Sequence, residues 1–160
     1  MSKIDFIAEP GKQETVITRI FDAPRDLVFK AYADPNLVPQ WWGPRKYTTR
    51  VDKMDVKPGG MWRYVQRDAD GSMHPFHGVY HEVVPSERLV YTFEYEGMPG
   101  HVMLETVSFE AQDGKTKMVD KSVFQSVEDR DGMINTGMEQ GMAETLDRFE
   151  ELLENIQNGK

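Results

Sequence analysis

The sequence predicts an α+β fold in which a curved antiparallel sheet wraps around a long C-terminal helix, with two short helices after the first strand. Three observations favour this fold. Residues 47–126 read as short strand-like segments separated by tight turns, which is typical of an antiparallel meander. Apolar residues between 134 and 156 recur at three- and four-residue steps, as on one face of a helix. Only this last element is long enough to cover the apolar face of the sheet.

The first strand and the two short helices are expected between residues 15 and 43. The stretch "TVITRIFD" alternates in polarity and predicts a strand. Asp22 can cap the helix that follows, Pro24 suits its first turn, and Pro35 ends it. A second helical turn, "PNLVPQWW", stops at Gly43-Pro44.

Six further strands follow, and each is bounded by a turn sequence. Their expected ranges are 47–56, 61–68, 76–84, 88–95, 101–111 and 116–126. Asp70-Gly71 and Asp113-Gly114 mark two of the hairpin turns. Ser126 is then a suitable N-cap for the helical region that closes the chain. The amphipathic helix predicted there has a length on the order of 40 Å.

Composition places limits on function and location. We expect one domain over residues 15–157, preceded by an N-terminal leader at 1–14. The 27 acidic residues against 19 basic ones give a net charge of −8, which disfavours binding to nucleic acid. No apolar run is long enough to insert into a membrane, and the first residues lack a signal-peptide pattern. Without cysteine, a cytoplasmic location is expected, and an exposed sheet edge would allow a homodimer.

Five stretches together resemble the activator of heat-shock protein 90 ATPase homologue family, a branch of the START-like (SRPBCC) superfamily. They are "FDAPRDLVFKAYADP", "WWGP", "DVKPGGMW", "FHGVYHEVVPSERLVYT" and "TGMEQGMAETLDRFEELL". The resemblance covers about residues 15–156 and implies a helix-grip fold with an internal cavity for a lipid-like or other apolar molecule. It also implies a link to the stress response and contact with a chaperone. Family members often carry tryptophan where this chain has Met142, a difference that would widen the cavity wall.

The adjacent tryptophans of "WWGP" are the first candidates for lining such a cavity. Neighbouring residues on a short helix point about 100° apart, so Trp41 and Trp42 cannot face one site together. We expect one indole to cover the cavity mouth and the other to fix the short helix to the sheet. The alternative is that both are ordinary core residues.

The long helix supplies further candidates. Met138 and Met142 lie next to Gly137 and Gly141, and each glycine inside a helix costs about 1 kcal/mol relative to alanine. Missing side chains where a helix meets a concave sheet leave either empty volume or close backbone contact, or they mark a bend. Methionine fills irregular apolar space, but it is also an ordinary core residue. Met103, on its strand, is therefore a candidate either for lining the cavity or for packing in the core.

The strands supply aromatic and polar candidates. Trp62 and Tyr64 share one face of the strand 61–67, and Arg63 and Arg67 share the other, but the sequence does not say which face is concave. Aromatic side chains on neighbouring strands and a histidine that could serve as a polar group inside the cavity complete the expected ligand-binding set. They are Tyr80, Phe93 and His77.

Catalytic and metal chemistry find little support in the sequence. His74, His77 and His81 have no suitable third ligand and no HExxH pattern, so no metal site or other cofactor is expected. Glu82 or Glu94 could act as an acid or base if buried. Three functions therefore remain: binding of a small apolar ligand, which we favour, a cyclase- or hydrolase-type enzyme on a hydrophobic substrate, or a co-chaperone-like interaction module.

Overall fold

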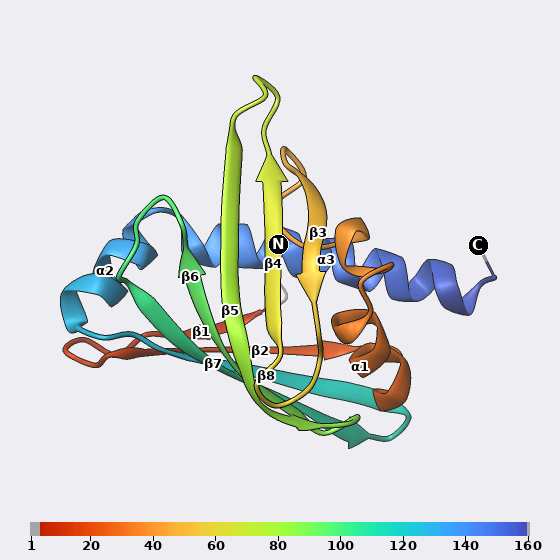
Figure 1. Ribbon diagram of the computed structural model, residues 1–160. Coiled ribbons are helices and arrows are strands. Elements are labelled where there is room, and N and C mark those ends of the chain that lie inside the picture. The colour runs from red at the N-terminus through yellow and green to blue at the C-terminus, as the bar shows by residue number, and fades with distance from the viewer. Residues whose placement is uncertain (1–3, 160) are drawn as a thin grey trace.

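An eight-stranded antiparallel sheet curves around one long helix in the computed structural model, which describes residues 4–159 (Figure 1). The strand order is β1-β2-β8-β7-β6-β5-β4-β3. The elements are β1 (Asp5–Ile7), β2 (Glu14–Phe21), α1 (Arg25–Ala33), the 3₁₀ helix η1 (Val38–Gln40), β3 (Thr48–Met54), β4 (Met61–Arg67), β5 (Met73–Val84), β6 (Arg88–Tyr95), β7 (Val102–Gln112), β8 (Lys115–Val123), α2 (Val127–Asn135) and α3 (Met138–Gln157). The fold class predicted from the sequence is confirmed, including the two short helices after the strand 14–21.

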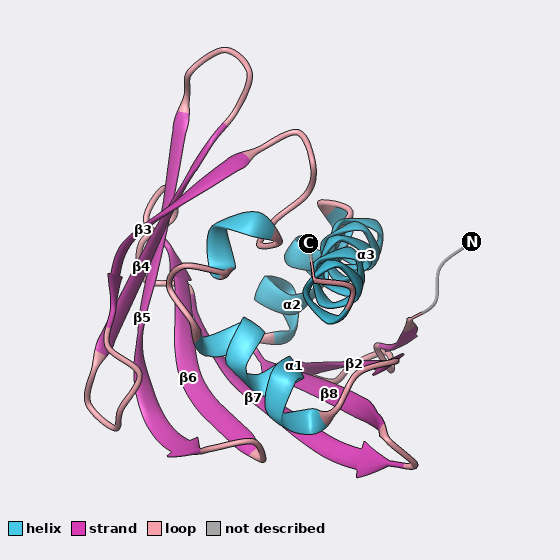
Figure 2. Ribbon diagram, turned by 90° about the vertical axis from the view of Figure 1, so that its right-hand side faces the viewer, coloured by secondary structure: helices cyan, strands magenta, loops and turns pink. Residues whose placement is uncertain are grey.

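Helix α3 lies in the concave side of the sheet, as the view along its axis shows (Figure 2). Phe149 of α3 is fully buried and meets Phe21 of β2 edge to face, with ring centroids 5.1 Å apart. Apolar burial and aromatic contacts of this kind stabilise the packing of helix on sheet. No helix within residues 4–159 is long and apolar enough to span a membrane.

Three features differ from the sequence prediction. Asp22 does not cap α1, whose N-cap position is Pro24 and has no side-chain hydrogen bond. Asp5–Ile7, inside the expected leader, form the edge strand β1, in which Phe6 pairs with Ile17. The closing helical region is two helices rather than one, because Gly137 adopts a left-handed conformation with φ of 93° between α2 and α3. Gly137 therefore marks a bend, one of the alternatives that the sequence left open. Ser126 does cap α2, where its hydroxyl accepts a hydrogen bond from the Asp129 N–H at 3.0 Å.

The sheet is bent sharply enough for β3, β4 and β5 to rise beside α3 rather than lie beneath it (Figure 2). Register shifts interrupt the β3–β4 pairing between Val51 and Lys53 and the β5–β6 pairing between Tyr80 and Glu82. Such bulges increase twist and bend a strand locally. They help to turn the sheet into a wall around the face of α3 that carries Gly141 and Met142.

Candidate functional site

A cavity of about 330 Å³ lies between α3 and the concave face of the sheet. Its walls come from α1, the segment after η1, the five strands β4 to β8, the end of α2 and the first turns of α3. Six of the eleven residues predicted to line a ligand site are found there: Trp41, Trp42, Phe93, Met138, Gly141 and Met142. The space beside Gly141 is open, since a Cβ added there would meet only Pro44 Cγ, at 3.9 Å.

The two tryptophans of "WWGP" take different roles in the packing. Trp41 is 2% exposed, donates a hydrogen bond from Nε1 to the Ala31 carbonyl at 3.0 Å, and packs on Phe149 with ring centroids 4.5 Å apart. Trp42 points to the other side and meets the rings of Tyr64 and Phe76 at 5.0 and 5.3 Å. Trp41 thus fixes the short helix to α1 and α3, while Trp42 joins the wall formed by β4 and β5.

The backbone after these tryptophans is tied to α3. Arg148 donates hydrogen bonds to the carbonyl oxygens of Gly43 and Gln40 at 2.6 and 3.2 Å. Gly43 has φ of 89°, and a Cβ added to it would lie 2.0 Å from Gln66 Nε2. A left-handed backbone and this close approach both require glycine here. The glycine therefore lets the chain turn out of the short helix along the cavity mouth.

The concave face of β4 is the one that carries Trp62 and Tyr64, which settles the alternative left open by the sequence. Both side chains are buried with Tyr80 and pack around Trp42. They surround a hollow of only about 20 Å³, beside the main cavity, and so form packed wall rather than open lining. Arg63 faces the opposite side, where it pairs with Glu96 at 2.7 Å.

His77 lies outside the cavity, on the face of β5 opposite to Phe76. Its ring nitrogens contact Glu94 and Glu96 at 3.3 and 3.0 Å. It cannot be the internal polar group that the sequence suggested, because the alternation of a strand sends neighbours to opposite faces. Among the predicted acid–base candidates, Glu82 pairs with Arg88, and this hydrogen bond lowers the pKa of Glu82.

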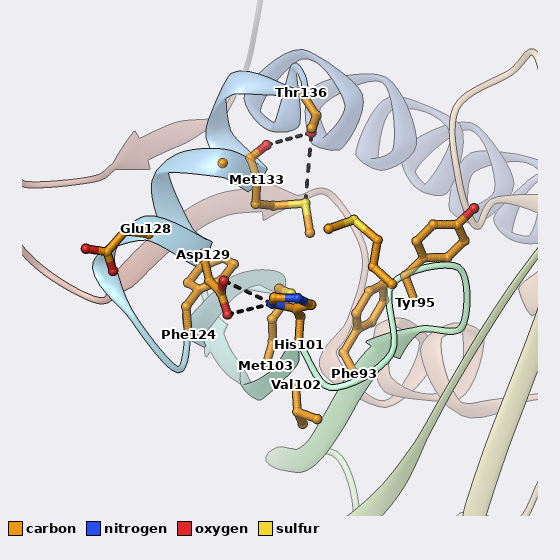
Figure 3. A pocket seen from close by; sticks show the side chains of 12 residues that line it. Phe93, Tyr95, His101, Val102, Met103, Phe124, Glu128, Asp129, Met133 and Thr136 are labelled. Carbon is orange, nitrogen blue, oxygen red and sulfur yellow. Dashed lines mark hydrogen bonds and ion pairs between the residues drawn. The ribbon is translucent and has the colours of Figure 1, made fainter.

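A second cavity, of about 270 Å³, opens between α2 and the start of β7. Met103, another predicted residue, lines it together with Phe124 and Met133 (Figure 3). The ring Nδ1 of His101, just before β7, lies 3.0 Å from Oδ1 of Asp129 on α2, within hydrogen-bond distance (Figure 3). Phe93, Met133 and Thr136 line both cavities, so the two spaces adjoin at the junction of α2 and α3.

Two buried carboxyl groups line the main cavity but were not predicted from the sequence. Glu105 of β7 and Asp120 of β8 are 7% and 5% exposed, and both line the cavity. Ser122 donates a hydrogen bond to Glu105 Oε2. Burial, together with the nearby charge of Asp120, raises the pKa of Glu105 well above its usual range. Burial likewise raises the pKa of Asp120, to about 6, although a hydrogen bond with Glu105 opposes the rise.

Two tyrosines complete the polar floor of the cavity. The hydroxyl groups of Tyr32 and Tyr91 lie 2.8 Å apart and share a hydrogen bond. Burial and the charge of Asp120 raise the pKa of the Tyr32 phenol, and burial together with the nearby Tyr32 and Asp120 raises the pKa of Tyr91. Strand alternation could have revealed the carboxyl groups, because Glu105 shares a face with the apolar Met103 and Val107. No comparable alternation in the sequence points to Tyr32, which lies on the helix α1.

No cluster of three or more potential metal-ligating side chains occurs within the part of the chain that the structure describes. The carboxyl pair of Glu105 and Asp120 can accept hydrogen bonds and exchange protons inside a largely apolar space.

The sequence matches the family described as activator of Hsp90 ATPase homolog 1-like protein over residues 22–154. The chain belongs to this family. Its members share the START-like, helix-grip fold, a scaffold for binding hydrophobic ligands, as the resemblance implied. A comparison with curated proteins found no match.

Solved structures of bacterial proteins have the same fold. One from Arthrobacter aurescens superposes with a TM-score of 0.89 at 23% identity, covering 96% of this chain and 93% of its own. A Rhodobacter sphaeroides protein gives a TM-score of 0.87 at 22% identity, with coverages of 94% and 97%. One from Staphylococcus epidermidis gives 0.79 at 29% identity, with coverages of 92% and 93%. These similarities support the fold rather than a particular ligand.

Proposed function

We propose that this protein binds a small hydrophobic or lipid-like molecule in the cavity between the sheet and α3. The observation that carries the proposal is an open-mouthed cavity of about 330 Å³ lined by aromatic and methionine side chains together with a few polar groups. Small-molecule sites are typically apolar hollows of about 300–1,000 Å³ with a small number of placed polar groups. The cavity fits the lower end of that range, which favours a compact ligand.

The bend at Gly137 suggests where a ligand enters the cavity. It separates α2 from α3, and Met133 and Thr136 just before it line both adjoining cavities. Methionine side chains adapt to varied apolar shapes. The junction of the two helices can therefore serve as the entrance, through which a ligand passes from the outer cavity to the inner one.

Binding can be tested with 8-bromooctan-1-ol, whose bromine quenches nearby indoles. We expect saturable quenching, because Trp41 and Trp42 both line the cavity. Replacing Met142 by tryptophan would fill the space next to Gly141 and should weaken binding. Replacing Met73, which is 53% exposed on β5, by tryptophan is the matched control. Quenching that does not saturate, or that is equal in both variants, would overturn the proposal.

A second candidate function is catalysis on a hydrophobic substrate, and the buried pair of Glu105 and Asp120 is the observation that favours it. Carboxyl groups with raised pKa values inside an apolar pocket are suited to proton transfer near neutral pH. Incubation of the protein with the molecule that co-purifies with it, followed by mass spectrometry, tests this candidate. Conversion that is lost in Asp120→Asn would support an enzyme, and an unchanged molecule would favour binding alone.

A further inference from the structure

Asp120 places an unsatisfied oxygen in the cavity. Its side chain is 95% buried, and Oδ1 has no hydrogen-bond partner among residues 4–159. A buried polar atom without a partner costs about 1–3 kcal/mol, and more when it is charged. Native structures seldom leave such an atom unpaired unless it serves a function or binds something. Asp120 lines the same space as the apolar residues of α3.

The polar groups around Asp120 offer too few hydrogen-bond donors. A carboxylate accepts hydrogen bonds and donates none, so the pair of Glu105 and Asp120 presents four acceptor oxygens. Ser122 donates to one of them, and a proton held by the pair can serve another. The hydroxyls of Tyr32 and Tyr91 bond to each other, which uses one of their two hydrogens. Among the groups beside Asp120, acceptors therefore outnumber donors.

No positively charged side chain on the surrounding elements pairs with the carboxyl groups of Glu105 and Asp120. On β2, which adjoins β8, Ile17 pairs with Asp120, and the inward-facing Arg19 donates to Asp147 and Glu150 of α3 instead, at 2.7 and 3.1 Å. Besides this arginine, whose Nε is buried without a hydrogen-bond partner, the titratable groups that interact with Asp120 within the described chain are acidic or phenolic: Glu105 of β7, Tyr91 of β6 and Tyr32 of α1. A ligand could supply the missing positive charge.

We propose that the cavity recognises an apolar amine, a molecule whose hydrocarbon body fills the space beneath α3 and whose ammonium group donates hydrogen bonds to Asp120 Oδ1 beside Glu105. This inference rests on the proposed ligand-binding function and adds the chemistry of the polar end of the ligand. An ammonium group has three donors and a positive charge, so it matches both the shortage of donors and the uncompensated acid. A carboxylate end would meet repulsion from the same groups.

Three eight-carbon probes with different polar ends distinguish this amine from other ligands. Octylamine, octan-1-ol and octanoate are each titrated against protein saturated with 8-bromooctan-1-ol, and recovery of tryptophan fluorescence reports displacement. At pH 7.5 octylamine should compete at least about tenfold better than octan-1-ol, since a charged hydrogen bond contributes about 1.5–3 kcal/mol and each 1.4 kcal/mol is tenfold. Octanoate should compete least.

Matched variants distinguish the effect of the buried Asp120 carboxylate on amine binding from the effect of the overall negative charge of the protein. Asp120→Asn should lower the affinity for octylamine at least about tenfold and leave that for octan-1-ol nearly unchanged. Glu139→Gln, on an exposed position of α3, removes the same charge at the surface and should have little effect on either probe. If Asp120→Asn folds poorly, Glu105→Gln provides a second variant, because its amide would donate to Asp120 and satisfy the free oxygen.

The pH dependence of octylamine binding gives an independent test of the proposal. Because the pKa of Asp120 is raised to about 6, lowering the pH from 7.5 to 5 should protonate it and weaken octylamine binding, while octan-1-ol binding stays constant. Equal competition by amine and alcohol, or equal losses in Asp120→Asn and Glu139→Gln, would overturn the amine and leave the hydrophobic cavity in place. Failure of 8-bromooctan-1-ol itself to quench saturably would overturn the proposed function and the amine together.

Discussion

Tyr91 of β6 lies directly opposite Glu105 of β7, and both side chains enter the cavity. The row continues on either side: Tyr80 of β5 lies opposite Tyr91, Ser122 of β8 opposite Glu105, and Thr15 of β2 opposite Ser122. Five adjacent strands thus carry a line of polar groups across an otherwise apolar face. Because register fixes these neighbours, a one-residue slip would turn the row to solvent and expose the core positions beside it.

Burial of Asp120, two residues before Ser122 on β8, should reduce the stability of the protein near neutral pH. The pKa of Asp120 rises from its ordinary value of 3.8 to about 6 because the carboxylate is buried. The folded protein therefore holds this proton more tightly than the unfolded chain does, and stability is lost as the pH rises from about 4 to about 6. Asp120→Asn should accordingly be about 3 kcal/mol more stable than the wild type at pH 7.5. Urea unfolding at several pH values measures the difference.

The same experiment has a clear internal check. The advantage of Asp120→Asn should vanish below about pH 3, where Asp120 is protonated in the unfolded chain as well as in the folded protein. Glu139→Gln, an exposed change of the same charge, should show no such pH dependence. An Asn variant that is less stable than the wild type at pH 7.5 would mean that the carboxylate is stabilised by a contact that the structure does not contain. A binding site that costs stability is a common compromise in proteins.

Gly43 should be the least replaceable glycine of the cavity mouth. Gly43→Ala adds a Cβ that lies 2.0 Å from Gln66 Nε2, in a backbone with φ of 89°. We expect a loss of about 3 kcal/mol, from left-handed strain together with the displacement of a buried side chain. Gly11→Ala is the matched control, since φ is 78° there and nothing lies within 4 Å of the added Cβ. It should cost only about 1 kcal/mol. Equal losses of unfolding free energy in the two variants would exclude the clash with Gln66.

The sequence predicts most of the fold because its periodicities are local. Strand alternation and turn residues locate β2 to β8, and the step of three or four residues locates the closing helices. The break between α2 and α3 is hidden, because Ile134 and Met138 are four residues apart and keep the helical spacing across Gly137. Gly137 and Gly141 made a bend one alternative in the sequence, and the left-handed backbone of Gly137 decides for it.

The site is harder to predict than the fold because it depends on register between distant strands. Trp41, Trp42 and Met142 are recognisable as large apolar residues near a break or a glycine, and all three line the cavity. Glu105 becomes a site residue only when β7 pairs with β6 and β8, which brings Tyr91 and Ser122 beside it. Charged residues on strands are usually solvated, so their type alone gave no reason to place them inside.

Substitutions of Trp41 and of Trp42 should lower the free energy of unfolding by different amounts. Trp41→Ala removes a side chain that is 2% exposed and hydrogen-bonded to Ala31, and should cost about 3–5 kcal/mol of unfolding free energy. Trp42→Phe keeps an aromatic ring against Tyr64 and Phe76 and should cost less than about 1.5 kcal/mol. Urea unfolding of the two variants checks the order. The reverse order would mean that the second indole, not the first, anchors the short helix.

Met133 offers a test of the passage between the two cavities, because its side chain lines both of them. Met133→Trp adds bulk at the point where α2 meets α3 and should slow the binding of 8-bromooctan-1-ol by about fivefold or more, since access then requires the helices to move. Equilibrium affinity should change less than the association rate, because most of the inner cavity remains open. Stopped-flow quenching measures both rates. Met98→Trp is a control at the outer cavity, where Met98 is 58% exposed on the loop between β6 and β7. If Met133→Trp leaves the association rate unchanged, the ligand enters elsewhere, and the mouth beside Gly43 becomes the route to examine.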